Sequence, residues 1–481
     1  MKTLARPAAP VAAVLLAALT ACTDGGAAGS GTAGGVKATP ARVHGTAGAP
    51  GLHDPYFEDL GNGGYDVRHY ALMLAYDPAS GRLDGTAEIT ARATQDLSSF
   101  NLDLAGMRVT GATVDGRAAV VSRSGQELTL RPRDDLGKGK TFRAVVRYSG
   151  TPERITDADG TTHEGWLKTA DGVIALGEPT GSMAWFPGNH HPSDKASYDI
   201  TMVVPEGLKA VSNGRLVSQR SVSGRSVFHW RSDEPMASYL ATVAIGKYDM
   251  KESRTPSGIP VLTAVDPTVA GQVAAEVARL PEVVEWGVKN FGPYPFSSTG
   301  VIVERAGDAA YALETQTRPV IPADGLDTTT LVHELAHEWF GDSVTPKTWR
   351  DMWLNEGFAT YAEWLWSEDH GGPSAEETFL ARYEQDRNAS LWSFAPADPP
   401  TAASISDYPV YVRGAMVVHK VRQALGDEAF FDIVRGWTKD HRYANASTDD
   451  FTSYVEARSG QDLTEMWDTW LYGKGKPVTS R

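Results

Sequence analysis

Two histidines and two glutamates in the second half of the chain have the types and spacing that can hold a metal ion and activate water. They lie in the run His333-Glu334-Leu335-Ala336-His337 and, after eighteen intervening residues, at Glu356. Residues four apart share one face of a helix, so both imidazoles can bind one ion while Glu334 reaches a metal-bound water. With Glu356 as third ligand, a tetrahedral Zn²⁺ keeps one position open, as a catalytic zinc requires. This spacing predicts a zinc hydrolase with one Zn²⁺ per chain.

The residues around this run predict the helices that must position it. Asp327 is suited to start a helix and Gly341 to stop it, and the residues between are mostly apolar. We therefore expect a buried helix, in which lone polar groups are costly and the histidines and glutamates must pair or ligate. A second helix is predicted over 351–366, with Glu356 in its first turns. The alternative, a chance motif on a half-buried surface helix, does not account for this context.

The first 22 residues predict a targeting segment. Lys2 and Arg6 supply positive charge, and Val11 to Ala18 form an apolar core too short to span a bilayer. Leu19-Thr20-Ala21-Cys22 then resembles the lipobox of bacterial lipoproteins, in which the cysteine becomes lipidated. Cys22 is the only cysteine, so an intramolecular disulfide and a thiolate metal ligand are excluded. An ordinary secretory signal with an incidental cysteine is the alternative. We expect an extracytoplasmic protein, anchored to the membrane by a lipid on Cys22, or secreted.

Composition limits the class of partner. The chain has 481 residues, of which 41% are hydrophobic and 22% charged, and its net charge is -15. This length predicts two or more domains. The negative charge argues against a nucleic-acid partner and weakly favours cationic groups such as peptide N-termini.

The apolar patterning changes along the chain and predicts an α+β, multidomain fold. Residues 1–21 are the predicted signal peptide, 22–50 a flexible Gly/Ala-rich linker, 51–250 an antiparallel β domain and 251–481 a mainly helical catalytic domain. Period-two alternation begins near residue 65 and recurs over 70–76, 87–91, 142–148 and 198–204. Asp115-Gly116 and Ser124-Gly125 predict hairpin turns. Later segments predict a strand over 300–304 and helices over 273–291, 376–387, 412–425, 428–440, 448–459 and 463–472.

The metal motif and its surroundings resemble a known family. The runs 333–342 (HELAHEWFGD) and 353–359 (WLNEGFA) follow the aminopeptidase N family of gluzincin zinc metallopeptidases almost residue for residue. The resemblance implies a saddle-like or sandwich-like β domain before a thermolysin-like catalytic domain. It also implies that His333, His337 and Glu356 bind zinc, that Glu334 is the general base and acid, and that peptides with a free N-terminus are the substrates.

Three further residues take a role from this resemblance. Tyr411 resembles the family tyrosine that donates a hydrogen bond to the oxyanion, with Tyr408 as a rival and Arg413 where the family has lysine. Tyr311-Ala312-Leu313-Glu314-Thr315 resembles a degenerate Gly-Ala-Met-Glu-Asn motif, in which Glu314 binds the substrate amine. The second amine anchor of the family is a glutamine, which the segment 176–180 does not contain, so Glu178 is the candidate there.

Several alternatives remain open at this stage. A gluzincin endopeptidase would need no amine anchor, an epoxide hydrolase would use the same zinc site on a lipid, and a non-catalytic binding lipoprotein would need no zinc. Larger family members continue into a C-terminal helical domain, whereas this chain ends at Arg481. We therefore expect a short form with a more open cleft.

Overall fold

The alternating segments after residue 65 build a large sheet in the computed structural model, which describes residues 44–385 and 390–478. In strand β2 (Tyr65–Asp77) the side chains of Tyr70, Leu72 and Leu74 are at most 2% exposed and alternate with more exposed neighbours. The sheet has the order β15-β16-β13-β2-β3-β9-β5-β6. Its other strands are β3 (Arg82–Ala93), β5 (Arg108–Val114), β6 (Arg117–Ala118), β9 (Thr141–Gly150), β13 (Lys195–Pro205), β15 (Arg215–Val222) and β16 (Arg225–Ala237). The predicted β-rich N-terminal half is confirmed.

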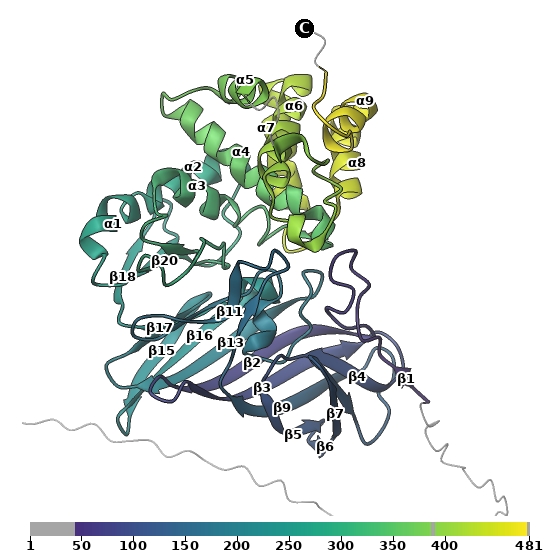
Figure 1. Ribbon diagram of the computed structural model, residues 1–481, viewed down its shortest axis with the longest axis vertical. Helices are drawn as coiled ribbons and strands as arrows, with labels where there is room; N and C mark the ends of the chain where they lie inside the picture. Colours follow the sequence, from purple (N-terminus) through teal and green to yellow (C-terminus); the bar gives the residue numbers. More distant parts are fainter. Residues whose placement is uncertain (1–43, 386–389, 479–481) are drawn as a thin grey trace, which may run out of the picture. The chain divides into compact units, whose positions relative to one another are not determined.

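Two smaller sheets complete this β-rich part (Figure 1). One is ordered β1-β4-β8-β7, with β1 (Thr46–Ala47), β4 (Leu97–Asp103), β7 (Val120–Ser124) and β8 (Glu127–Arg131). The other is ordered β10-β11-β12-β17-β14, with β10 (Arg154–Thr156), β11 (His163–Lys168), β12 (Val173–Leu176), β14 (Lys209–Ser212) and β17 (Val243–Gly246). The pairs β13–β2 and β1–β4 are parallel, so the pairing is not purely antiparallel as expected.

Strand β1 lies inside the segment assigned to the flexible linker. The backbone N–H of Thr46 donates to Asp96 at 3.0 Å, and that of Gly48 donates to Ser99 at 2.9 Å. A Cβ on Gly45 would lie 2.3 Å from the backbone of Leu97, so glycine permits this close approach. Residues 46–47 are therefore part of a sheet, which shortens the linker at its C-terminal end.

The predicted turn at Asp115-Gly116 connects β5 to β6. Both residues have positive φ, 49° for Asp115 and 76° for Gly116. Asp and Gly are the residues that tolerate this conformation in a two-residue hairpin loop. The sequence prediction of a hairpin is confirmed.

A fourth sheet and the first helices follow. The sheet is ordered β18-β19-β20-β21, with β18 (Asp249–Arg254), β19 (Pro260–Val265), β20 (Thr299–Glu304) and β21 (Val320–Pro322). The single helix predicted over 273–291 was wrong, because the chain forms α1 (Ala270–Val277) and α2 (Leu280–Phe291). Pro281 is at the start of α2, and a proline cannot supply the N–H that would continue the preceding helix.

The two helices of the metal motif are present at the expected places. Helix α3 (Thr328–Ala336) begins after Asp327, whose Oδ1 accepts the N–H of Thr330 at 2.8 Å. Its regular part ends at Ala336, five residues before the predicted stop, and His337 keeps helical dihedrals as the C-cap. A short 3₁₀ turn, Trp349–Met352, leads into α4 (Trp353–Asp369).

The remaining helices gather around α4 and α6, in green and yellow in Figure 1. They are α5 (Ala375–Gln385), α6 (Gly414–Leu425), α7 (Asp427–Asp440), α8 (Thr448–Ser459) and α9 (Thr464–Met466). A π-helical turn, Pro409–Arg413, precedes α6, and another, Trp467–Leu471, follows α9. A two-stranded sheet joins β22 (Thr345–Pro346) to β23 (Asn445–Ala446).

The described residues belong to one compact unit, within which the β-rich and helical parts touch directly. The exact division near residue 250 stays a prediction. In the described part of the chain, none of the helices combines the length and apolar character needed to cross a membrane. The predicted signal peptide, including Cys22, lies outside the described residues.

Candidate metal centre and active site

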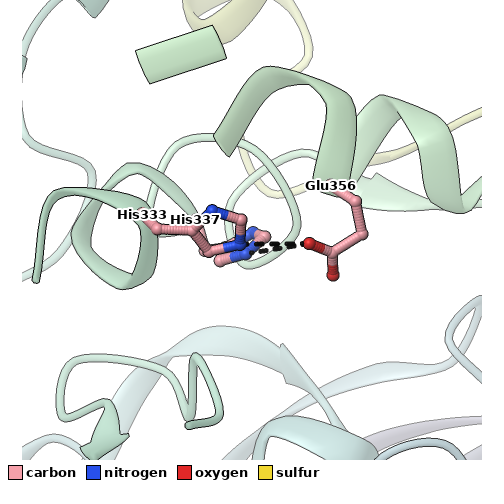
Figure 2. Close-up of side chains that lie close together, drawn as sticks. All are labelled: His333, His337 and Glu356. Atoms are coloured by element: carbon pink, nitrogen blue, oxygen red, sulfur yellow. Dashed lines mark hydrogen bonds and ion pairs between the residues drawn. The ribbon is translucent and has the colours of Figure 1, made fainter. Parts of the chain in front are cut away.

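Helices α3 and α4 bring His333, His337 and Glu356 together (Figure 2). The two histidines are four residues apart on α3 and its C-cap, and Glu356 is in the first turn of α4. His333 Nε2 lies 3.2 Å from Glu356 Oε2, and His337 Nε2 lies 3.5 Å from the same oxygen. His337 and Glu356 are almost completely buried, with exposed fractions of 1% and 3%.

These separations fit a zinc ion. Ligand bonds of ~2.0–2.1 Å in a tetrahedron place neighbouring donor atoms about 3.3 Å apart. The observed 3.2 and 3.5 Å bracket that value, and the donor atoms of all three residues lie within 4.8 Å of one another. The donor set of two imidazoles and one carboxylate is a typical catalytic zinc set.

The other nitrogen of each histidine is held by a residue that the sequence analysis missed. His333 Nδ1 is 2.7 Å from Glu363 Oε1, and His337 Nδ1 is 2.6 Å from Asn355 Oδ1. Such partners fix the ring orientation and leave Nε2 free for the metal. Glu363 lies seven residues after Glu356, two helical turns along the same face, which is the one signal that could have indicated it.

Asn355 has a second contact that joins the metal site to the predicted amine anchor. Its Nδ2 donates to Glu314 Oε1 at 3.0 Å. Gly341 packs against the same amide, since a Cβ at Gly341 would lie 2.0 Å from Asn355 Oδ1, and its φ is 118°. Gly341 is therefore required by the close approach of Asn355 as well as by its backbone conformation.

Glu334 and Tyr411 reach the metal centre from different elements. Glu334 lies on α3 between the two histidines and is 6% exposed. The Tyr411 ring stacks against His333 with centroids 6.0 Å apart and an interplanar angle of 11°. Its rival Tyr408 instead accepts a hydrogen bond from Arg382 at 3.3 Å and does not line the cavity at the metal centre. Arg413 points elsewhere and donates to backbone carbonyls, including that of Trp470 at 3.0 Å.

The two predicted amine anchors lie next to the ligands. One carboxylate oxygen from each of Glu178, Glu314 and Glu356 lies within a group spanning at most 4.8 Å. Glu178 Oε1 is buried and has no hydrogen-bond partner among the described residues. Tyr311, which occupies the glycine position of the family motif, donates from its hydroxyl to the backbone oxygen of Glu178 at 3.4 Å. Carboxylates this close together favour a cationic occupant.

All seven predicted site residues line a single cavity of about 390 Å³. They are Glu178, Glu314, His333, Glu334, His337, Glu356 and Tyr411. Glu178 comes from the segment after β12, Glu314 from the segment between β20 and β21, and the others from α3, α4 and the turn before α6. The structure therefore assembles in one place residues that are spread over more than 230 positions of the chain.

Burial dominates the electrostatics of these groups. It raises the pKa of Glu334 to about 7, against the opposing effect of the two histidines. Burial also raises the pKa of Glu356, but His337 and His333 outweigh it and bring the value to about 2. Burial and then the charge of Glu356 raise the pKa of Tyr411 well above its ordinary value. Glu356 is thus an ionised ligand, and the Tyr411 phenol keeps a proton to donate.

Comparison with known families agrees with this geometry. Residues 67–240 match the peptidase M1 N-terminal domain, and residues 322–470 match the peptidase family M1 domain. The chain belongs to the M1 family of zinc metallopeptidases. The predicted resemblance to aminopeptidase N, the predicted fold class and the predicted catalytic zinc are confirmed.

Relatives and solved structures of this family cover much of the chain. Aminopeptidase M1 of Arabidopsis thaliana is 27% identical over 63% of this chain and 37% of its own length. Aminopeptidase M1-D of Oryza sativa subsp. japonica is 26% identical over 85% of this chain and 50% of its own length. The chain thus spans half or less of these two relatives. The M1 zinc metallopeptidase of Deinococcus radiodurans is 28% identical, covers 90% of this chain and 100% of its own, and superposes with a TM-score of 0.82.

Proposed function

We propose that this M1 family member is a zinc-dependent aminopeptidase that hydrolyses the first peptide bond of peptides with a free N-terminus. The observation that carries this proposal is the position of Glu178 and Glu314, whose carboxylates lie beside the ligand Glu356 in one cavity. A peptide ammonium bound there would place the first carbonyl next to the metal centre. The aminopeptidase relatives support this reading, as does a mutant form of the Deinococcus radiodurans enzyme bound to a Tyr-Ser-Ala substrate.

The residues of the cavity divide the chemistry among them. His333, His337 and Glu356 would hold the zinc, which when bound acidifies water and polarises the scissile carbonyl. Glu334 takes a proton from the attacking water and returns it to the leaving amine. The Tyr411 hydroxyl donates a hydrogen bond to the carbonyl oxygen as negative charge develops there.

Glu178 and Glu314 determine which bond is cut. Both accept hydrogen bonds from the substrate ammonium, and Asn355 fixes the position of Glu314 by donating to Oε1. Because the ammonium is bound at a set distance from the metal centre, only the first peptide bond reaches Glu334. An endopeptidase with the same zinc ligands would bind internal segments without this pair of anchors.

Fluorogenic aminoacyl amides and their N-acetylated forms test the proposal directly. Free-amine substrates should be cleaved, N-acetylation should abolish cleavage, and a chelator should remove activity that added Zn²⁺ restores. Equal cleavage of acetylated and free substrates would instead identify an endopeptidase. A protein without bound zinc or peptidase activity would be a non-catalytic binding protein, and conversion of a lipid epoxide alone would point to the epoxide hydrolase reaction.

We also propose that the chain is exported and anchored to the outer face of the cell membrane through a lipid on Cys22. This proposal is supported only by the sequence of residues 2–22. Metabolic labelling with an alkyne fatty acid tests it, with the variant Cys22→Ser as control. Label on the wild-type protein but not on the variant is expected, and an unlabelled protein in the culture medium would contradict lipid anchoring.

A further inference from the structure

The catalytic cavity contains more carboxyl groups than the proposed reaction uses. Seven carboxylates line it, and no lysine or arginine from the described chain does. Four of them have roles as metal ligand, general base or amine anchor. The other three are Asp157, Asp159 and Asp407.

Asp157 and Asp159 lie in the turn between β10 and β11, and Asp157 is close enough to Glu178 for its charge to add to burial in raising the pKa of that carboxyl. Asp157 Oδ1 accepts the N–H of Ala158 at 2.6 Å, and no described residue bonds to its other oxygen. Burial raises the pKa of Tyr311 most, and the charges of Glu164, Glu178 and Asp157 raise it further, in that order. Asp157 therefore lies near the Tyr311 hydroxyl, which donates to the backbone oxygen of Glu178. Asp159 has a different task, since its carboxylate accepts the N–H groups of Thr161 and Thr162 and shapes the turn.

Asp407 lines the cavity from the helical part of the chain. It precedes the π-helical turn Pro409–Arg413 that carries Tyr411. The backbone oxygen of Asp407 accepts the N–H of Val410 at 2.9 Å, whereas its carboxylate makes no hydrogen bond or ion pair with the described residues. The Asp407 side chain is exposed, so its charge faces both solvent and the cavity.

The three aspartates differ from many acidic residues of this protein, which have basic partners. Asp84, Asp134 and Asp233, for example, each lie within 3.0 Å of an arginine. None of the three cavity aspartates forms an ion pair in the described part of the chain. A cavity whose lining has more acidic than basic groups favours ligands of positive charge.

We propose that Asp157 and Asp407 make this aminopeptidase selective for substrates whose first residue is lysine or arginine, an inference that rests on the proposed function. The side chain of the first residue branches from the carbon that carries the ammonium, so it begins beside Glu178 and Glu314. Because Asp157 and Asp407 line the same cavity as these anchors, a long cationic side chain bound there shares the cavity with both carboxylates. An apolar side chain of the same length would leave both carboxylates without a counter-charge.

Arginine and citrulline substrates measure this selectivity, because the two side chains have nearly the same shape and differ in charge. The kcat/KM for arginyl-aminomethylcoumarin should exceed that for the citrullyl compound by about tenfold, the effect of one charge-assisted hydrogen bond. In the double variant D157N/D407N the ratio should fall to within about twofold of one, while cleavage of the citrullyl substrate is retained. The matched control Asp324→Asn removes a carboxylate that is exposed and outside the cavity, and should leave the ratio unchanged.

Binding measurements separate this inference from the proposed function. Calorimetry with the Glu334→Gln variant should show tighter binding of Arg-Ala than of citrulline-Ala, again by about tenfold and dependent on Asp157 and Asp407. If the wild-type enzyme is inactive, the aminopeptidase assignment is refuted. The ratio of the affinities for Arg-Ala and citrulline-Ala then still tests the selectivity. Equal rates and equal affinities for arginine and citrulline would refute the selectivity alone, as would a preference that survives in D157N/D407N.

Discussion

At the scale of single residues, Tyr411 and Glu334 meet at one cavity but their replacement has different consequences. The Tyr411 hydroxyl makes no hydrogen bond with the described residues, while its ring packs on His333. Tyr411→Phe should therefore fold normally and lower kcat by ~10²–10³, the usual effect of losing one oxyanion donor. Steady-state kinetics would measure this, with Tyr408→Phe as a control expected to keep wild-type rates. A near-normal kcat for Tyr411→Phe would remove the phenol from the mechanism.

Glu334→Gln should separate metal binding from proton transfer. Glu334 is not among the three zinc ligands, so the variant should keep one zinc per chain by elemental analysis. Loss of general acid and base catalysis should reduce kcat by at least ~10²–10⁴. Loss of zinc from this variant would show that Glu334 supports the metal site itself.

The resemblance of the sequence to the aminopeptidase N family predicted the zinc ligands, Glu334, Tyr411 and the two proposed amine anchors, and the structure brings all of these residues together around one cavity. It did not indicate Asn355, although this residue is next to Glu356 in the chain. The reason is that its two partners, His337 and Glu314, are 18 and 41 positions away. Hydrogen bonds over such separations depend on how helices pack, which local patterns do not specify.

At the scale of elements, α4 supports the metal site through both Asn355 and Glu363. Asn355→Ala would leave His337 Nδ1 with only the backbone oxygen of Phe340, at 3.1 Å, and Glu314 Oε1 without its donor. Loss of such a partner typically lowers metal affinity 10- to 100-fold. Chelator competition should detect this change, together with a higher KM for free-amine substrates.

Asn290→Ala provides the matched comparison for that variant. Asn290 is also buried, and its amide donates to the backbone of Trp286 within α2, away from the cavity. Zinc affinity should be unchanged in Asn290→Ala even where thermal stability falls. Equal zinc affinities in the two variants would contradict a positioning role for Asn355.

Periodicity predicted most elements correctly, and the exceptions have local causes. The alternation over 70–76 and 142–148 lies in β2 and β9, and the strand over 300–304 lies in β20. The helix predicted over 273–291 is divided before Pro281, and the segment before α6 forms a π-helical turn. The first of these breaks was readable from the proline, whereas the turn at 409–413 has no equivalent signal in the apolar pattern.

At the scale of the whole molecule, Lys195 ties the large sheet to the segment that follows the metal helix. Its Nζ donates to the backbone oxygens of Asp342 and Ser343, each at 2.9 Å, and burial lowers its pKa to about 7. Between pH 7 and the ordinary lysine pKa of 10.5, Lys195 is protonated in the unfolded chain and neutral in the folded chain. Stability from this group therefore rises with pH over that interval.

Lys195→Met removes this pH dependence. The free energy of unfolding of the wild type, relative to Lys195→Met, should increase as pH rises from about 7 to 10. Denaturant melts at several pH values would measure the difference. A difference that stays constant or decreases over that range would show that Lys195 is charged and well solvated in the folded protein.

Under the proposed function, the double contact of Asn355 makes zinc and the substrate amine thermodynamically linked ligands. The same amide orients His337 and Glu314, so whatever orders one of these side chains helps to order the other. Such linkage is reciprocal, so if bound zinc raises the affinity for the substrate amine, the bound amine raises the affinity for zinc by the same factor. An unreactive free-amine dipeptide should consequently slow the escape of zinc into a chelating buffer, and its N-acetylated counterpart should not.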